Sequence, residues 1–568
     1  MKWLPWVGVL GVFAVLVGVV APGRGAAWFN DDGLFLVLSW NAAHGFGLDL
    51  SVPQAPHYLF HALLMKAGVR ELLDFRIINY LVSLASSMVF FLALDRRRFR
   101  SPVVPVAVCA SLLVSLNSIQ GPNSLAMAFC LLGTGSYFFA IDASGRSRST
   151  WLAASGVFFA LSGFMHAAVF FGMIVLMGII LMLDRSVRRS PLVPFFLAAS
   201  ACLWGVYIRV LGLDNFLVAP GGHDARPGHL LRALWRIGTL YLEAALIYAV
   251  TAAAFWRMGH RKFGAAQAVL SIAATLFYGA TFLADIAGMR PPPAVLGWFF
   301  LSGEGQWISR VPGTVFYILL FAAFRCIGEA WPRLERKWLI ATAALVLLHV
   351  ATQVGSNTAV IQGMVFFAGP ALGLSVLLWH ALDRPDPPPW RVFAPVTAAW
   401  LVLVTVFAFA YNHPTVERVL SAGRTRLHEA PLRGVLVTPR YASAVARLTA
   451  AYTATGCQTL PIAAFEYIPM ADYILQRTGR PGGRVIRPSM GFPEERIKAA
   501  LNPAAGWCVV DTTGEETQTD IRRSGVDKRA AVRDWVAGQS DRFTLIPAPS
   551  PDLTDIRLYV RDARGGHQ

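Results

Sequence analysis

Long apolar runs recur through the first 411 of the 568 residues and constrain the fold more than any other feature of the sequence. A helix needs about 20 apolar residues to cross a hydrocarbon core roughly 30 Å thick. Thirteen segments are candidates for such spans: 4–21, 73–94, 102–117, 124–142, 151–165, 167–183, 192–211, 237–256, 265–286, 312–329, 338–353, 359–381 and 392–411. The sequence therefore predicts a multi-span α-helical membrane protein with about 13 transmembrane helices.

The charged residues orient these spans. Only 15% of the chain is charged, against about 25% in soluble domains, and the net charge is +17. In a soluble protein such an excess would suggest nucleic acid as a partner. Here the basic residues collect on alternate short connections, for example at Arg96–Arg98 and Arg185–Arg189, as the positive-inside rule requires. We therefore expect an inner (plasma) membrane protein with a cytoplasmic N-terminus, membrane lipids around its spans, and no nucleic-acid partner.

The composition changes after Tyr411, and two domains are expected, 1–411 in the membrane and 412–568 as a soluble α/β domain. An odd number of spans puts the second domain on the extracytoplasmic (periplasmic) side. Residue patterns predict strands at 433–439, 507–511, 543–547 and 556–560, and helices at 440–455 and 527–538. Cys457 and Cys508 both lie in this domain, and an oxidising compartment would allow a disulfide between them. The sequence leaves that bond open.

The first outer loop, 22–72, carries two adjacent carboxylates, Asp31 and Asp32. Like charges side by side are unfavourable unless a cation, a proton or a substrate offsets them. A positioned carboxylate is also the group that a general base requires. The alternative is structural, because carboxylates stabilise the positive N-terminal end of a helix. The run Asp32–Ala43 predicts such a helix, lying at the membrane interface with its apolar side chains, including Trp40, as anchors.

The order of motifs in this loop resembles the GT-C superfamily of integral-membrane glycosyltransferases. The matching pieces are Asn30–Gly33, His44–Gly47, Pro56–Leu59 and Arg76. The resemblance implies a polyprenyl-phosphate or pyrophosphate sugar donor and an acidic first-loop residue as catalytic base, here Asp31 or Asp32, between which the motif does not choose. It also implies substrate contacts at His57, Tyr58 and Arg76. No Trp-Trp-Asp motif follows in the C-terminal domain, which argues against an oligosaccharyltransferase.

Other outer-face residues complete the predicted site. A leaving phosphate needs cations, and the long outer connections supply Arg226, Arg290 and Arg310, whose alternative role is to meet lipid headgroups. Glu304 is the candidate second acidic group. His57 and His61 have a spacing that can bind metal, although anchoring of the helix is the simpler interpretation. The sequence is compatible with a divalent cation and equally with none.

Three functions follow from this organisation. The first is transfer of a sugar from a polyprenyl-(pyro)phosphate donor to an envelope lipid, glycan or protein acceptor on the outer face. The second is a multi-span transporter or lipid flippase with a periplasmic accessory domain, which should carry ionisable residues near the membrane midplane and often an internal repeat. The third is a non-catalytic scaffold. The spans are nearly free of charge and the polar groups collect on one face, which favours the glycosyltransferase.

Overall fold

The computed structural model describes the chain in segments with gaps between them. The described residues are 4–23, 31–44, 56–95, 98–113, 121–211, 235, 335–353, 368–381, 424–437, 439–465, 469–478, 484–486, 506–512, 528–546 and 556–562. They belong to two compact units. The first, called the helical unit, comprises Met1–Val20, Arg76–Phe216 and Asp224–Val419; the second, the mixed unit, comprises Ala21–Phe75, Leu217–His223 and Leu420–Gln568. The boundary predicted near residue 411 stays a prediction.

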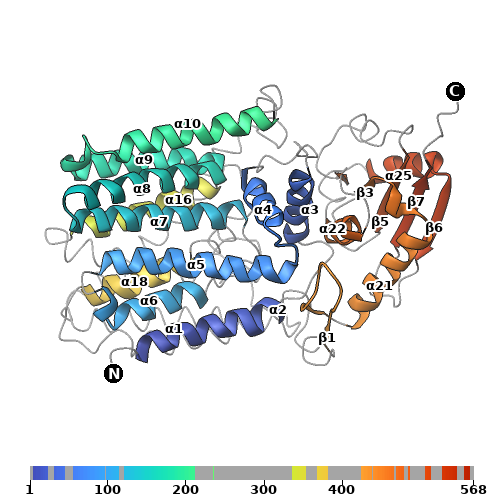
Figure 1. Cartoon of the computed structure of the whole chain (residues 1–568), viewed down its shortest axis with the longest axis horizontal. Coiled ribbons are helices and arrows are strands. Elements are labelled where there is room, and N and C mark those ends of the chain that lie inside the picture. Colours follow the sequence, from blue (N-terminus) through green and yellow to red (C-terminus); the bar gives the residue numbers. More distant parts are fainter. Residues whose placement is uncertain are drawn as a thin grey trace. The chain divides into compact units, whose positions relative to one another are not determined.

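The helical unit is built from long apolar helices that run side by side (Figure 1). Its described helices, one of which starts in the mixed unit, are α1 (Leu4–Val15) with η1 (Leu16–Val20), α5 (Leu72–Leu94), α6 (Val103–Leu113), α7 (Pro122–Asp142), α8 (Gly145–Met165), α9 (Ala167–Leu183), α10 (Leu192–Leu211), α16 (Arg336–Gln353) and α18 (Ala368–Ala381). Among the residues that the structure describes, four stretches are long and apolar enough to cross a membrane: Pro5–Gly23, Leu72–Leu94, Pro122–Asp142 and Leu192–Arg209. The chain is thus a multi-helix, membrane-type protein.

Most predicted spans coincide with a helix, and the differences are at the ends. The segments predicted at 73–94, 124–142 and 167–183 match α5, α7 and α9 to within two residues at either end. The spans predicted at 237–256, 265–286, 312–329 and 392–411 lie outside the described residues. The total of 13 therefore stays a prediction.

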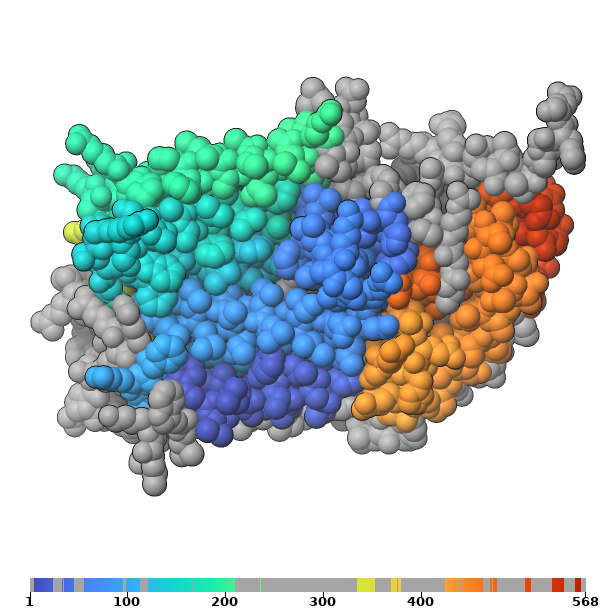
Figure 2. All heavy atoms as spheres, in the orientation of Figure 1, coloured from blue at the N-terminus to red at the C-terminus, as the bar shows by residue number. Residues whose placement is uncertain are grey.

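Glycines allow the membrane helices to approach closely. A Cβ added at Gly133 of α7 would lie 2.7 Å from the ring of Phe159 on α8, and one added at Gly156 of α8 would collide with the carbonyl oxygen of Leu192 on α10. The close approach of α7 and α8 also allows a hydrogen bond between them: Ser155 Oγ donates to the carbonyl oxygen of Gly133 at 2.8 Å. Small residues and interhelical hydrogen bonds are the usual means of packing helices in lipid. In the space-filling view the green atoms of α10 adjoin the teal atoms of the helices that precede it in the chain (Figure 2).

The mixed unit contains a five-stranded sheet in the order β4-β3-β5-β7-β6. Strand β3 is parallel to both of its neighbours, β4 and β5, while β7 is antiparallel to β5 and β6. The elements are β3 (Ile462–Phe465), β4 (Arg484–Ile486), β5 (Trp507–Thr512), β6 (Arg542–Ile546), β7 (Ile556–Arg561), α21 (Pro439–Ala454), α22 (Pro469–Thr478) and α25 (Lys528–Gln539). The α/β class of this region follows directly from this sheet.

The sequence patterns located most of these elements. The predicted strands at 507–511, 543–547 and 556–560 correspond to β5, β6 and β7, and the predicted helices correspond to α21 and α25. The strand predicted at 433–439 is shorter, with only Leu436–Val437 (β2) paired, to Thr425–Arg426 (β1). Elements β3, α22 and β4 were not predicted.

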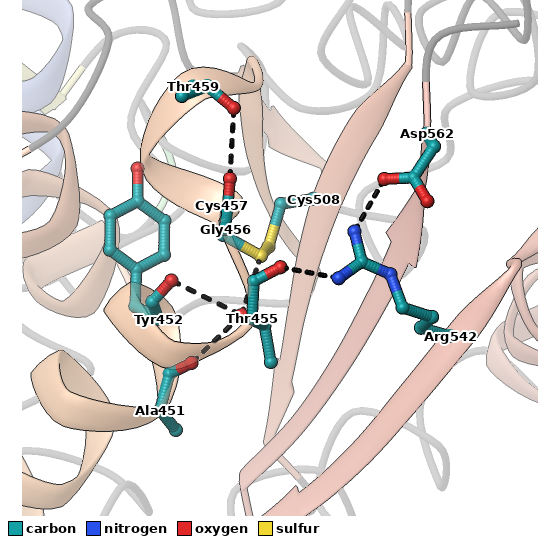
Figure 3. Close-up of a disulfide and its surroundings, with 9 residues drawn as sticks. All are labelled: Ala451, Tyr452, Thr455, Gly456, Cys457, Thr459, Cys508, Arg542 and Asp562. Atoms are coloured by element: carbon teal, nitrogen blue, oxygen red, sulfur yellow. Dashed lines mark hydrogen bonds and ion pairs between the residues drawn. A yellow bond between two sulfur atoms is a disulfide. The ribbon is translucent and has the colours of Figure 1, made fainter.

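Cys457 and Cys508 form a disulfide with a Cα–Cα separation of 5.6 Å (Figure 3). It joins the short helix η7 (Cys457–Thr459) to β5 at the centre of the sheet. Thr455, at the end of α21, donates a hydrogen bond to the sulfur of Cys457, and its carbonyl oxygen accepts one from Arg542 of β6 at 2.9 Å. The disulfide therefore fastens the α21–η7 connection to the sheet.

The segment predicted as the first outer loop, here called the first loop, packs within the mixed unit. Its helices are α3 (Asp31–Ala43) and α4 (Pro56–Lys66), which contact each other, and α3 also packs against α22. Hydrogen bonds tie the ends of the loop to the C-terminal region: Arg424 Nη1 donates to the carbonyl oxygen of Gly23 at 3.1 Å, and the amide of Leu72 donates to that of Pro431 at 2.9 Å. Segment Ala21–Phe75 is thus folded together with residues far along the chain.

Candidate functional site

The acidic pair lies at the start of α3. The helix begins at Asp31, so Asp31 and Asp32 occupy its first turn. In that position the helix dipole favours negative charge. The two side chains themselves lie outside the described part of the structure. The predicted helix is confirmed, while the roles of the two aspartates stay predictions.

The apolar face of α3 is buried in protein. Leu36 and Val37 are fully buried, Leu38 is 2% exposed, and Trp40 is 6% exposed. The expectation that the apolar side chains of this helix, including Trp40, anchor it at the membrane interface is wrong for Leu36, Leu38 and Trp40, because these side chains are enclosed by protein and α3 packs on α4 and α22. A helix enclosed in this way is held in one orientation.

Trp40 is the centre of a cluster with residues of α22. The guanidinium carbon of Arg477 lies 4.5 Å from the centroid of the Trp40 indole, a cation–π geometry. The ring of Tyr473 meets the indole edge-on at 6.4 Å. On the α3 side, the His44 imidazole lies 4.0 Å from the indole and hydrogen-bonds the carbonyl oxygen of Trp40 at 2.8 Å. We call Trp40, His44, Tyr473 and Arg477 the Trp40 cluster.

Tyr473 extends this cluster to the segment before α5. Its hydroxyl donates to the carbonyl oxygen of Arg70 at 2.8 Å. Burial raises the pKa of Tyr473 well above its ordinary value; the charges of Glu71 and Asp74 add to the rise, and those of Arg477 and Arg70 oppose it. The phenol therefore stays protonated at neutral pH and acts as a fixed donor.

The predicted substrate residues on α4 form a buried aromatic row. His57 is fully buried, and Tyr58 and His61 are each 1% exposed. The His57 ring lies 4.7 Å from Phe35 of α3, 4.0 Å from Tyr58 and 6.0 Å from His61. Burial lowers the pKa of His61 to about 3, so that it is neutral at physiological pH. These ring contacts hold α4 against α3, and the substrate role of His57 and Tyr58 stays a prediction.

Of the remaining predicted site residues, Arg76 lies in the described part of the structure and the others do not. Arg76 is fully buried, and Asn79 and Tyr80 further along α5 are buried with it. A buried guanidinium requires polar partners, so this part of α5 is a polar site within an apolar helix. Arg226, Arg290, Arg310 and Glu304 lie outside the described residues. The described residues contain no group of three or more His, Cys, Asp or Glu side chains that could hold a metal ion.

The sequence did not assign a role to Tyr473 or Arg477. One signal was available: Pro469 is suited to the first turn of a helix, and apolar side chains recur at helical spacing through the ten residues Pro469–Thr478. The sequence does not show which element packs against α22, because its partner α3 lies far earlier in the chain.

No family model matches the chain, and no curated protein matches it. Among solved structures the chain is similar to the oligosaccharyltransferase of Archaeoglobus fulgidus in its apo form, with 12% identity, a TM-score of 0.45, and coverage of 90% of this chain and 69% of that one. It is also similar to ArnT from Cupriavidus metallidurans, with 13% identity, in the apo state (TM-score 0.41, 99% of each chain) and bound to undecaprenyl phosphate (TM-score 0.37, 98% of each chain).

Both proteins are GT-C glycosyltransferases, the superfamily that the first-loop motifs resemble. Since every one of these TM-scores is below 0.5, we take the chemistry of the site from the residues of this chain alone.

Proposed function

We propose that this protein is a membrane glycosyltransferase that moves a sugar from a polyprenyl-(pyro)phosphate donor to an acceptor on the outer face of the membrane. The observation that carries the proposal is the setting of Asp31 and Asp32 in the first turn of α3, a helix whose apolar face is buried between α4 and α22. Two carboxylates on a firmly held helix suit general-base catalysis, which depends on the position of the base.

The proposed chemistry is an inverting displacement. One aspartate accepts the proton of the acceptor hydroxyl. The hydroxyl oxygen forms a bond to the anomeric carbon as the bond from that carbon to the donor phosphate breaks. The phosphate leaves with the electron pair and needs cations to stabilise its charge. Arg226, Arg290 and Arg310 are the proposed source, with Arg76, His57 and Tyr58 as further substrate contacts and Glu304 as a second acid. The acceptor is an envelope lipid, glycan or protein.

The proposed location of the site is the extracytoplasmic side of the inner membrane. A disulfide between Cys457 and Cys508 is suited to an oxidising compartment, since cytosolic thiols are kept reduced. The basic residues on alternate connections favour a cytoplasmic N-terminus, which puts the C-terminal region on the extracytoplasmic side as well. Residues 412–568 would then form a periplasmic domain.

A transfer assay with matched variants tests the proposal. Purified protein is incubated with a panel of polyprenyl-phosphate sugars and envelope acceptors, and the product mass is measured. Asp31→Asn and Asp32→Asn are tested singly and together, with Asp142→Asn at the exposed end of α7 as the control. We expect loss of a general base to slow transfer by about 10²–10⁴-fold, in the double variant and in one of the single variants. The control should keep wild-type activity.

Two results would contradict the proposal. Full activity in the double variant would remove both aspartates from the mechanism. Movement of labelled donor across the membrane of proteoliposomes, with no product of increased mass, would indicate the transporter or flippase alternative. Repeating the active reaction in the presence of a chelator decides whether a divalent cation takes part.

A further inference from the structure

One short helix of the C-terminal region contacts both ends of the first-loop structure. Tyr473 and Arg477 lie four residues apart on α22 and therefore on the same face of the helix. Arg477 covers the indole of Trp40 on α3, and Tyr473 donates its hydroxyl proton to the carbonyl oxygen of Arg70, just before α5. Helix α22 thus fixes α3 relative to the segment that leads into α5.

The contact between Arg477 and Trp40 is enclosed. Trp40 is 6% exposed, and Arg477 is half-buried. Within the described part of the chain, the Nε atom of Arg477 is buried and makes no hydrogen bond, and neither does the Nε1 atom of Trp40. A cation–π pair from which water is excluded is stronger than an exposed one, because solvent no longer screens the charge.

The contact lies on the same rigid element as the acidic pair. Trp40 follows Asp32 by eight residues on the continuous helix α3, a distance of about 12 Å along its axis at 1.5 Å per residue. A small rotation or tilt at Trp40 therefore moves the first turn of α3 as well. Misplacing a catalytic group by about 1 Å can cost roughly 10²-fold in rate.

We propose that Arg477 is a positioning residue: by covering Trp40 it holds α3 in the orientation that presents its acidic first turn to the acceptor hydroxyl. The inference rests on the proposed function. It gives the C-terminal region a part in the chemical step itself, in addition to any part in acceptor recognition.

The test compares kcat and KM in four variants of the full-length protein. Arg477→Gln removes the cation, Arg477→Lys keeps it, Trp40→Leu removes the ring, and Arg477→Gln is combined with Trp40→Leu. We expect Arg477→Gln to lower kcat about 10–100-fold with KM for the donor within about twofold, and Arg477→Lys to restore much of the loss. The double variant should be no slower than the slower single variant, since both remove one interaction. Arg433→Gln, an exposed arginine of the mixed unit, is the control.

Hydrogen exchange of α3 gives a readout that does not need activity. Arg477→Gln should raise exchange in residues 35–43, while Arg433→Gln should not. Wild-type kcat and wild-type exchange in Arg477→Gln would overturn the inference and leave the proposed function standing. A raised KM with unchanged kcat would also overturn it, because Arg477 would then bind substrate. Absence of transfer by the wild-type protein with every donor would overturn the proposed function, and the positioning role with it.

Discussion

The guanidinium carbon of Arg477 lies 4.5 Å from the centroid of the Trp40 indole, although Arg477 belongs to the C-terminal region and Trp40 to the first loop. The loop is therefore part of a unit whose other half is made much later in the chain. Segments Ala21–Phe75 and Leu420–Gln568 meet through helix packing between α3 and α22 and through hydrogen bonds such as that from the amide of Leu72 to the carbonyl oxygen of Pro431. A change in either segment should be felt in the other.

Replacing Tyr473 by Phe should weaken this association. The substitution keeps the ring but removes the hydroxyl that donates to the carbonyl oxygen of Arg70 at 2.8 Å. Loss of one such hydrogen bond costs about 1 kcal/mol of folding stability. The cost is larger where the carbonyl oxygen is left buried without a partner. We expect a thermal unfolding midpoint a few degrees below wild type in detergent. An unchanged midpoint would show that the bond contributes nothing net.

Breaking the disulfide should destabilise the sheet of the mixed unit. The bond closes a loop between residues 51 apart in sequence, for which chain entropy predicts about 4 kcal/mol of stabilisation. The Cys457→Ser/Cys508→Ser variant should unfold at lower temperature, and Cys202→Ser, an exposed cysteine of α10, should not. Without reductant, a thiol-reactive label should add to neither Cys457 nor Cys508 in the denatured wild-type protein; labelling of both would contradict the bond.

Adding one methyl group should destabilise the protein at Gly156 but not at Gly205, two glycines of the helical unit. In Gly156→Ala the new Cβ meets the backbone of Leu192 and lies 2.9 Å from the amide nitrogen of Phe196, so α8 and α10 must move apart. Such overpacking costs about 1–3 kcal/mol. Gly205→Ala, on an exposed part of α10 with open space around its Cβ, is the matched control and should be neutral or slightly stabilising. Equal melting temperatures for the two variants would contradict the packing.

Acid should destabilise the mixed unit through His61. Its pKa is about 3 in the folded protein because it is buried, against 6.5 when exposed in the unfolded chain. Between these values the unfolded chain binds a proton that the folded chain does not, so stability falls as pH drops through this window. The loss is at most about 1.4 kcal/mol per pH unit.

The measurement compares unfolding midpoints at pH 7 and pH 5 in wild type and His61→Leu. The wild-type midpoint should drop more than that of His61→Leu, in which the titrating group is gone. His428→Gln, an exposed histidine of the same unit, should behave as wild type. If His61→Leu keeps the full acid sensitivity, another group is responsible.

The membrane helices were predictable because the signal is local. The length and hydropathy of a run such as 73–94 are enough to predict a helix, and α5 spans Leu72–Leu94. The strands β5, β6 and β7 were predictable for the same reason, since their β-branched and aromatic residues alternate over five or six positions.

The environment of the site was not predictable, because it depends on contacts between distant segments. The apolar face of α3 indicates that something covers it, but the pattern is the same for lipid and for protein. Trp40 was therefore interpreted as an interfacial anchor, whereas Arg477 and Tyr473 cover it. Helix α22 was missed because its ten residues are largely polar on one side and gain their partner only in the folded protein.

The hydrogen bonds between Arg70 and Tyr473 and between Gly23 and Arg424 join residues 403 and 401 positions apart. Synthesis proceeds at about 5–20 residues per second, so the first loop emerges at the membrane tens of seconds before its partners exist. During that interval α4 is available to pack against α3, but the cover that Tyr473 and Arg477 give to Trp40 is missing. We therefore expect the native packing of α3 to be completed only after α22 has been synthesised. Chains that stop short of α22 should accumulate as species cleaved within the first loop.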